Sequence, residues 1–227
     1  MSRVIEEPKT VGEALSGGEA RNWNAAMKEE LNALKRNETW ELVERPKDGN
    51  VIGSKWVYKL KTDMCGEVER YKSRLVAQGF NQIKNVNFSD TYSLVMKAKT
   101  VRVLFAIAVE MGWEMHHPDI VSAYLNGTLK ETVYMEQPPN FDDLEKPRCQ
   151  YVCRLRKTLY GLQQSGKEWN YCIDQFLKQL GSHDCISEPC VYVKKGLRDG
   201  KTGLIIGLFV DDLIVTGKPC EILEFKR

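Results

Sequence analysis

The sequence predicts an α+β fold, because segments with helical spacing are interspersed with antiparallel hairpins. Three stretches repeat apolar residues every three to four positions, and several short apolar or alternating runs are joined by turn residues. This order fits α+β better than alternating βαβ units with a parallel sheet. The 227 residues, 42% hydrophobic and 28% charged, suffice for a core and for one or two domains.

The first half of the chain is predicted to hold a short helix, a longer helix and one clear hairpin. The short helix follows a possible capping box at 10–13. The longer helix runs from Trp23 to about Lys35, with apolar side chains on one stripe. A short strand spans 39–45. In the segment 55–62, the aromatic and leucine side chains at 56, 58 and 60 share one face, and the residues at 55, 57, 59 and 61 share the other. The turn 63–66 returns the chain as a second strand over 67–78.

The second half is predicted to hold two helices and an apolar hairpin. A helix over 97–111 is expected to turn one set of side chains inward: Val101, Leu104, Phe105, Ala108 and Val109. A strand over 113–120 ends near Asp119. The proline-rich, acidic stretch 134–148 predicts a surface loop. Further expected elements are strands over 152–155 and 191–194, a helix over 167–180, and the hairpin strands 204–209 and 213–215.

Overall charge says little about partners, because the net charge is only +2. The local distribution is more informative. Six cations lie between positions 55 and 74, against three carboxylates, and a basic hairpin of this kind can hold phosphates. A solvated strand face explains the same pattern equally well. The six cations are Lys55, Lys59, Lys61, Arg70, Lys72 and Arg74.

Seven cysteines, an odd number, with no signal peptide indicate reduced thiols in a cytosolic or nuclear protein that is not secreted. A zinc set could be drawn from the second half, but no CxxC pair exists and the spacing fits no common finger. The longest apolar run, about seven residues, is too short to span a membrane. That zinc set would be Cys149, Cys153, His183, Cys185 and Cys190.

The segment Phe209-Val210-Asp211-Asp212 places two adjacent aspartates between two apolar runs. Carboxylates at the tip of a buried hairpin are costly unless a cation or a partner satisfies them. Plain turn chemistry is the alternative. Asp119, at the end of a predicted strand, supplies a third carboxylate, and three clustered carboxylates suit two-metal nucleotidyl transfer. An unrelated phosphotransferase is disfavoured because the chain has no Gly-rich phosphate loop.

Six motifs together resemble the reverse transcriptase region of copia-type retrotransposon Pol polyproteins, especially that of insect copia elements. The resemblance runs from about Glu7 to the last residue. The motifs are Trp40-Glu41-Leu42-Val43, Lys55-Trp56-Val57-Tyr58-Lys59, the segment from Arg70 to Phe80, the segment from Asp119 to Leu129, the segment from Leu159 to Gln164, and Phe209-Val210-Asp211-Asp212.

The resemblance implies catalytic and metal-binding roles. Asp119, Asp211 and Asp212 match the family's three catalytic aspartates. Asp119 and Asp211 would bind two magnesium ions, with manganese as an alternative, and the carbonyl of Ile120 would be a further ligand. Asp212 would support the site. The reaction would be RNA-directed DNA synthesis on a primer 3′-hydroxyl, with an RNA or DNA template and deoxynucleoside triphosphates as partners.

The resemblance also implies residues that contact the substrate. Tyr124 matches the aromatic residue that lies under the sugar and excludes a ribose 2′-hydroxyl; taken alone, it could be an ordinary core aromatic. Arg74 matches the residue that holds the incoming base and its phosphate, a role suited to a guanidinium. The lysines of the hairpin would hold phosphates, and a glycine and a glutamine would position template and nucleotide. These last residues are Lys59, Lys61, Lys72, Gly161 and Gln164.

The implied architecture is that of the family's fingers and palm, with the palm sheet packed on helices and the thumb absent. The expected division is an N-terminal extension over 1–20, fingers with part of the palm over 21–112, and palm with inserted fingers elements over 113–227.

Pro118 stands where the family has an apolar residue that donates to the sheet, and a central strand rarely tolerates proline. The expected location is a cytoplasmic virus-like particle or the nucleus. A catalytically inactive transposon remnant with residual nucleic-acid binding is the alternative function.

Overall fold

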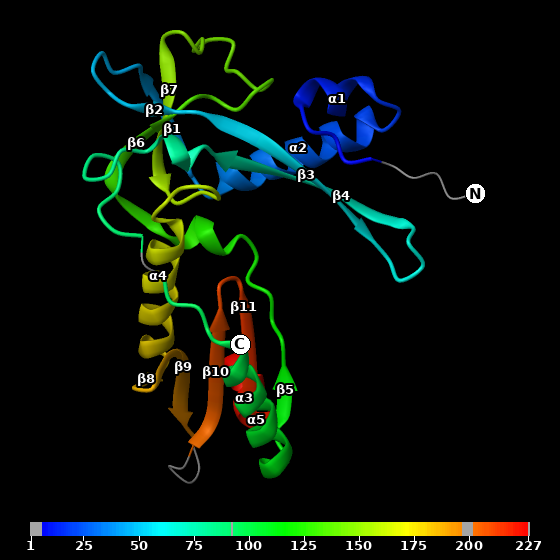
Figure 1. Ribbon diagram of the computed structural model, residues 1–227, viewed down its shortest axis with the longest axis vertical. Coiled ribbons are helices and arrows are strands. Elements are labelled where there is room, and N and C mark those ends of the chain that lie inside the picture. The colour runs from blue at the N-terminus through cyan, green and yellow to red at the C-terminus, as the bar shows by residue number, and fades with distance from the viewer. Residues whose placement is uncertain (1–5, 92, 197–201, 227) are drawn as a thin grey trace. The chain divides into compact units, whose positions relative to one another are not determined.

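The computed structural model describes residues 6–91, 93–196 and 202–226 (Figure 1). Its contacts divide the chain into two units. The first consists of Met1–Asp90 with Thr128–Ser165, and the second of Thr91–Gly127 with Gly166–Arg227. Each unit is therefore assembled from segments that are distant in sequence, and a division at single chain positions does not describe them.

In its described residues, the first unit contains a four-stranded sheet, a two-stranded ribbon and two α-helices. The strands of the sheet follow the order β1-β7-β6-β2, in which only β2 and β6 pair in parallel. The helices are α1 (Val11–Ser16) and α2 (Ala20–Arg36), and a short 3-10 turn, η1, covers Gly79–Asn81. The sheet strands are β1 (Trp40–Glu44), β2 (Val51–Ile52), β6 (Thr128–Met135) and β7 (Tyr151–Lys157).

The ribbon consists of β3 (Ser54–Thr62) and β4 (Val68–Ala77), paired antiparallel. Trp56 lies opposite Leu75 and Tyr58 opposite Ser73, and all four are buried. Trp23 of α2 meets Tyr58 edge to face, with ring centroids 5.3 Å apart. The alternation predicted for residues 55–62 is thus confirmed: one face of the ribbon packs on α2 and leaves the charged face to solvent.

The second unit is built on a five-stranded sheet in the order β5-β11-β10-β9-β8. All four strand pairs are antiparallel, as the sequence predicted. The strands are β5 (Glu114–His116), β8 (Ser182–Cys185), β9 (Glu188–Lys195), β10 (Thr202–Phe209) and β11 (Asp212–Gly217). The remaining elements are α3 (Ala98–Met111), the 3-10 turn η2 (Ala123–Asn126), α4 (Ser165–Gln179) and α5 (Pro219–Phe225).

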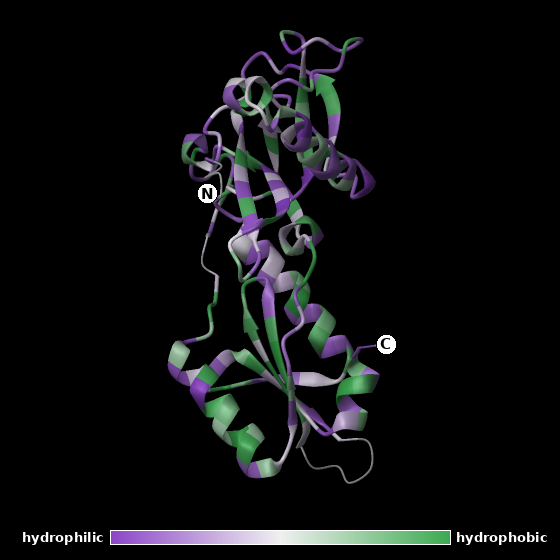
Figure 2. Cartoon of the chain, turned by 90° about the vertical axis from the view of Figure 1, so that its right-hand side faces the viewer, coloured by the Kyte–Doolittle hydropathy of each residue, from purple (hydrophilic) through white to green (hydrophobic). Residues whose placement is uncertain are grey.

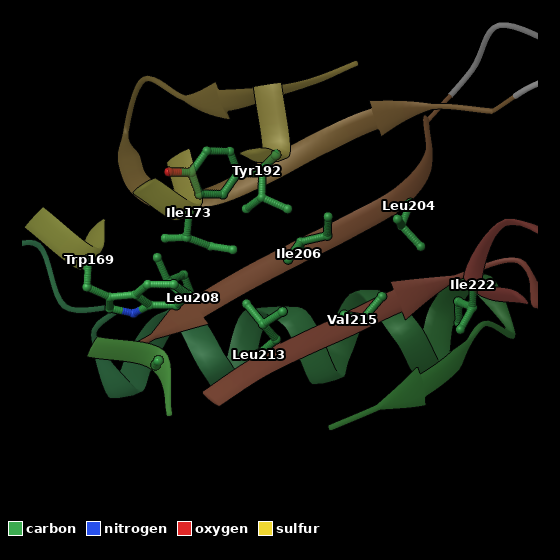
Figure 3. Close-up of a cluster of buried hydrophobic side chains, with 11 residues drawn as sticks. Trp169, Ile173, Tyr192, Leu204, Ile206, Leu208, Leu213, Val215 and Ile222 are labelled. Carbon is green, nitrogen blue, oxygen red and sulfur yellow. The ribbon is translucent and has the colours of Figure 1, made fainter. Parts of the chain in front are cut away.

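Helices cover both faces of this sheet, because β10 and β11 are apolar on both sides. Ile206, Leu208 and Val215 belong to a cluster with Trp169 and Ile173 of α4 (Figure 3). Ile205 of β10 points to the opposite face of the sheet. There it belongs to a second cluster, to which α3 contributes Leu104, β9 contributes Cys190 and Val191, and Met96 also belongs. In Figure 2 the strands at the centre of this unit are accordingly coloured as largely hydrophobic. The continuous apolar run that predicted a buried strand is thus explained.

Four strands and α-helices of the described residues were missed, and so were both 3-10 turns. The four are β2, β6, β8 and α5. Strand β6 alternates between more exposed and more buried residues, and no element was predicted over 128–133. Its last two residues, 134 and 135, were wrongly assigned to the predicted loop 134–148. Within α3 the expected inward set was partly wrong. Leu104 and Ala108 are buried, whereas Phe105 is 52% exposed and Val109 is 81% exposed. An apolar residue was assumed to face inward, and this helix carries apolar residues on its outer face as well.

The cluster around Ile206 should dominate the stability of the second unit. We expect Ile206→Ala to lower the free energy of unfolding by about 3 kcal/mol, because it removes buried methyl groups and leaves a cavity. Ile186→Ala is the matched control, since Ile186 is fully exposed; its effect should stay within about 0.5 kcal/mol. Urea denaturation of both variants measures the difference. Equal effects would show that this cluster is not the core.

Candidate active site

The two adjacent aspartates lie at the tip of the β10–β11 hairpin. Phe209 pairs with Asp212, so Val210 and Asp211 form a two-residue turn. Val210 has a φ of 55°, while Asp211 is not among the described non-glycine residues with positive φ. A positive φ at only the first central position is the signature of a type II′ turn, which normally has glycine there. A β-branched residue in this region is strained.

Trp169 of α4 stabilises this turn with a hydrogen bond. Its indole Nε1 donates a hydrogen bond of 2.7 Å to the carbonyl oxygen of Val210. The Trp169 side chain is buried, and Leu208 and Leu213, which flank the turn, belong to the same apolar cluster (Figure 3). The hydrogen bond fixes the peptide plane that joins Val210 to Asp211. The packed helix therefore offsets the strain of the turn and sets the direction of the aspartate that follows.

Asp119 is brought to the hairpin by backbone pairing. It forms an antiparallel bridge with Asp212. The amide of Ile120 donates to the carbonyl of Asp211 at 3.1 Å, and the amide of Leu213 donates to the carbonyl of Pro118 at 3.1 Å. Asp119 and Asp212 are thus a directly opposed, non-hydrogen-bonded pair. Side chains of such a pair share one face of the sheet, and their Cα atoms lie about 4.5 Å apart.

Pro118 is compatible with this geometry, contrary to the expectation that it stands in a central strand. Strand β5 is the first of the sheet order β5-β11-β10-β9-β8, so it is an edge strand. Glu114 pairs with Gly217 and Asp119 with Asp212, which keeps one register with no bulge. Pro118 lies opposite Leu213 in the adjacent hydrogen-bonded pair, where its carbonyl accepts the Leu213 N–H but it cannot donate in return. Proline therefore costs one ladder bond here, just beyond the residues of β5, and leaves the register unchanged.

His117 is a neighbour of the aspartates that sequence reasoning missed. Its Nε2 lies 3.6 Å from Oδ1 of Asp212. The available signal was its position two residues before Asp119, which places both side chains on one face of an extended segment. Among the described residues, no three histidine, cysteine, aspartate or glutamate side chains are arranged to hold one metal ion. Carboxylate oxygens do fit magnesium in kind, and the metal ligands Asp119, Ile120 and Asp211 stay predictions.

In the first unit, the predicted phosphate-binding residues gather on one face of the β3–β4 ribbon. Lys59 lies opposite Lys72 and Lys61 opposite Arg70, while Arg74 lies opposite Val57. We call the face formed by Lys59, Lys61, Arg70, Lys72 and Arg74 the cation face. The pKa of Lys72 is lowered, mainly because its ammonium is partly buried and also because the neighbouring cations repel it. Such clustered positive charge is costly without an anion, so the face is suited to bind one.

Three of these cations already have partners. Arg70 forms an ion pair of 2.5 Å with Glu29. Lys59 forms an ion pair of 2.9 Å with Glu7. The Arg74 guanidinium lies 4.5 Å from the ring centroid of Tyr160, a cation–π contact. This contact orients the guanidinium by stacking and leaves its N–H groups able to donate elsewhere.

Comparison with known proteins decides the family. The family described as "Reverse transcriptase (RNA-dependent DNA polymerase)" matches residues 37–227. The chain belongs to the reverse transcriptase family. Its resemblance to copia-type Pol polyproteins is also confirmed. It is 36% identical over 219 residues to the retrovirus-related Pol polyprotein from transposon RE1 of Arabidopsis thaliana, covering 96% of this chain and 14% of that protein.

Two further relatives support the same assignment. The Pol polyprotein from transposon TNT 1-94 of Nicotiana tabacum is 38% identical over 212 residues, which cover 93% of this chain and 16% of the relative. The transposon Ty1-LR2 Gag-Pol polyprotein of Saccharomyces cerevisiae is 29% identical over 239 residues, which cover 95% of this chain and 12% of the relative. The chain therefore spans a small part of the length of these relatives. They come from plants and yeast, and the insect likeness stays a prediction.

The description of this family names RNA-dependent DNA polymerase activity, which agrees with the activity that the sequence predicted from the family resemblance. Tyr124, the predicted sugar-contacting residue, lies in η2 and is half-buried against the cluster around Trp169. With Val210 and Trp169 it lines a cavity of about 130 Å³. Tyr124 is therefore close to the aspartate turn and also contributes to the core, so both interpretations of its role stay open.

Gly161 and Gln164 have structural roles in the first unit of the reverse transcriptase. Gly161 has a φ of +93°, and a Cβ built on it would lie 2.1 Å from the carbonyl oxygen of Ala77. Gln164 is buried; its amide nitrogen donates to the Asn87 carbonyl at 2.8 Å, and its oxygen accepts from Gln82 at 3.0 Å. These contacts explain both residue types by packing. The substrate contacts implied by the resemblance stay predictions.

The hydrogen bond from Trp169 to Val210 should be coupled to the strain in the turn. We expect Trp169→Phe to lower the free energy of unfolding by about 2 kcal/mol, because a partly buried carbonyl loses its donor. In a Val210→Gly background the loss from the hydrogen bond should shrink, since glycine lets the peptide reorient toward water. The volume change is the same in both backgrounds and cancels in the double-mutant cycle. Strictly additive effects in urea denaturation would contradict the coupling.

Gly161 and Gly66 form a matched pair for testing close backbone approach. Both have positive φ, but a Cβ at Gly66 would meet nothing within 4 Å. Gly66→Ala should cost about 1 kcal/mol of stability from the left-handed backbone alone. Gly161→Ala should cost at least about twice as much, because it adds a clash with main-chain atoms that cannot swing away. The two free energies of unfolding give the comparison, and equal values would rule out the close approach.

Proposed function

We propose that this chain is the fingers and palm part of a copia-type polymerase that carries out RNA-directed DNA synthesis. The second unit would be the palm and the first unit the fingers. The observation that carries the proposal is the backbone pairing that puts Asp119 beside Asp211 and Asp212. This pairing supports the proposal because it brings the backbone of three aspartates from two distant segments to one end of a sheet, and nucleotidyl transfer needs clustered carboxylates.

The aspartates would provide hard oxygen ligands near the primer terminus. Two bound magnesium ions would supply Lewis-acid chemistry, activating the 3′-hydroxyl and stabilising the leaving pyrophosphate. Asp119, Asp211 and the carbonyl of Ile120 would hold these ions, and manganese could replace magnesium. Asp212 would support the site, with His117 at its side. The fixed hairpin register would keep these groups at constant spacing from one turnover to the next.

The cation face would bind the triphosphate of the incoming deoxynucleotide. Lys59, Lys61 and Lys72 would offer ammonium groups, and Arg74, oriented by Tyr160, would offer a planar guanidinium to the base and its phosphate. Tyr124 would limit the space below the sugar and disfavour a ribose 2′-hydroxyl. Template and primer, as RNA or DNA, would be the other partners. We place this activity in a cytoplasmic virus-like particle or in the nucleus.

Primer extension by the purified chain tests the proposal. With a primed template, deoxynucleotides and magnesium, we expect extension that Asp211→Asn reduces about a hundredfold or more, because the substitution removes a carboxylate charge from the metal-binding set. Asp184→Asn is the matched control, since Asp184 lies in β8 and pairs with Lys178; its extension should equal that of the unsubstituted chain.

One observation favours a second candidate, nucleic-acid binding without synthesis by an inactive remnant. The cation face belongs to the first unit, whereas the aspartates belong to the second, so binding could persist without catalysis. No extension by any variant, together with salt-sensitive binding of the primed template that Lys72→Ala weakens, would favour this candidate. Extension lost only in Asp211→Asn would favour the polymerase.

A further inference from the structure

The outer face of helix α3 is apolar and lies outside the proposed catalytic machinery. Val103 is 55% exposed, Phe105 52% and Val109 81%. The helix is coloured largely as hydrophobic in Figure 2. Its buried side, with Leu104 and Ala108, packs on β10 and its neighbours. A surface helix normally carries polar residues on the face opposite the core, so this second apolar face indicates an interaction surface.

The same face carries a pair of opposite charges at defined positions. Arg102, Ala106 and Glu110 are spaced four residues apart and therefore lie along one line of the helix surface. All three are exposed. Among the described residues, neither Arg102 nor Glu110 has an ion-pair partner. The small side chain of Ala106 lies midway between the two charges, with Val103 and Val109 beside it.

This arrangement is complementary to itself. Two copies of α3 can be placed antiparallel, with a two-fold axis at Ala106. A residue a given number of positions before Ala106 then faces the partner's residue the same number of positions after it. Arg102 then faces the partner's Glu110, and Val103 faces the partner's Val109. Each contact occurs twice, as an isologous interface requires. A parallel arrangement would instead place like charges together.

We propose that the chain forms a symmetric homodimer through antiparallel α3 helices. The alanine at the axis allows the helices to approach to about 8 Å, the lower end of normal helix packing. The valines form the apolar centre, and the two Arg102–Glu110 pairs fix direction and register. A single helix face buries less area than a standard interface of about 1,600 Å², so the dimer is weak, with a dissociation constant in the micromolar range.

Charge exchange tests the register directly. In sedimentation equilibrium we expect Arg102→Glu and Glu110→Arg each to weaken dimerisation about tenfold, because two attractive pairs become repulsive. The double variant R102E/E110R restores the pairs with their signs exchanged, so it should dimerise like the unsubstituted chain. Circular dichroism confirms that all variants are folded. A chain that remains monomeric to several hundred micromolar overturns the proposal, as does a double variant no tighter than the single ones.

Cysteine cross-linking tests the position of the two-fold axis. Ala106→Cys should give a disulfide-linked dimer under mild oxidation, because the two copies of position 106 meet at the axis. Lys99→Cys is the matched control: it lies on the same exposed face, but its two copies would be about 20 Å apart along the helices. The unsubstituted chain gives the background from its own cysteines. Equal cross-linking at both positions would show that another surface associates, which also overturns the proposal.

Discussion

Strand β11 pairs with β10 on one side and β5 on the other, and the candidate active site depends on this double pairing. The pairing with β10 closes a two-residue turn and sets Asp211 and Asp212 at its end. The pairing with β5 continues in one register to Asp119. Because backbone hydrogen bonds fix both registers, a shift of one residue on either side would turn the aspartates to different faces of the sheet.

The cost of this arrangement is concentrated at Val210 and Pro118. Val210 adopts a positive φ that glycine would adopt without strain, and Pro118 cannot donate to the ladder. Both costs are met by the surrounding structure. The indole of Trp169 donates a hydrogen bond to the carbonyl of Val210, and the packing of α4 on the sheet keeps the indole in position. Pro118 lies on an edge, where one absent donor leaves only one carbonyl without its usual partner. Strain at a functional turn that is offset by a rigid core is a familiar feature of enzyme sites.

The two units carry complementary chemistry. The second holds carboxylates at the end of a sheet that is buried on both faces. The first holds a ribbon whose apolar face is anchored on α2 and whose opposite face gathers cations. The carboxylates and the clustered cations thus belong to separate units, each with its own packed apolar residues. The apolar outer face of α3 is a third surface, and its charge pattern suits a second copy of the same helix better than it suits nucleic acid.

The sequence by itself determined the antiparallel α+β class, the alternating ribbon, the apolar aspartate hairpin and the family. These depend on local periodicity and on ordered motifs, which are legible along the chain. It misjudged Phe105 and Val109, because periodicity reports an apolar stripe but not whether a neighbour covers it. It also misjudged Pro118, because edge and central strands look alike until the strand order is known. The positive φ of Val210, the bond from Trp169 and the approach of His117 to Asp212 were decided only by the tertiary structure. The two contacts join residues that are distant in the sequence, and the φ of Val210 depends on the turn that the pairing of β10 with β11 closes.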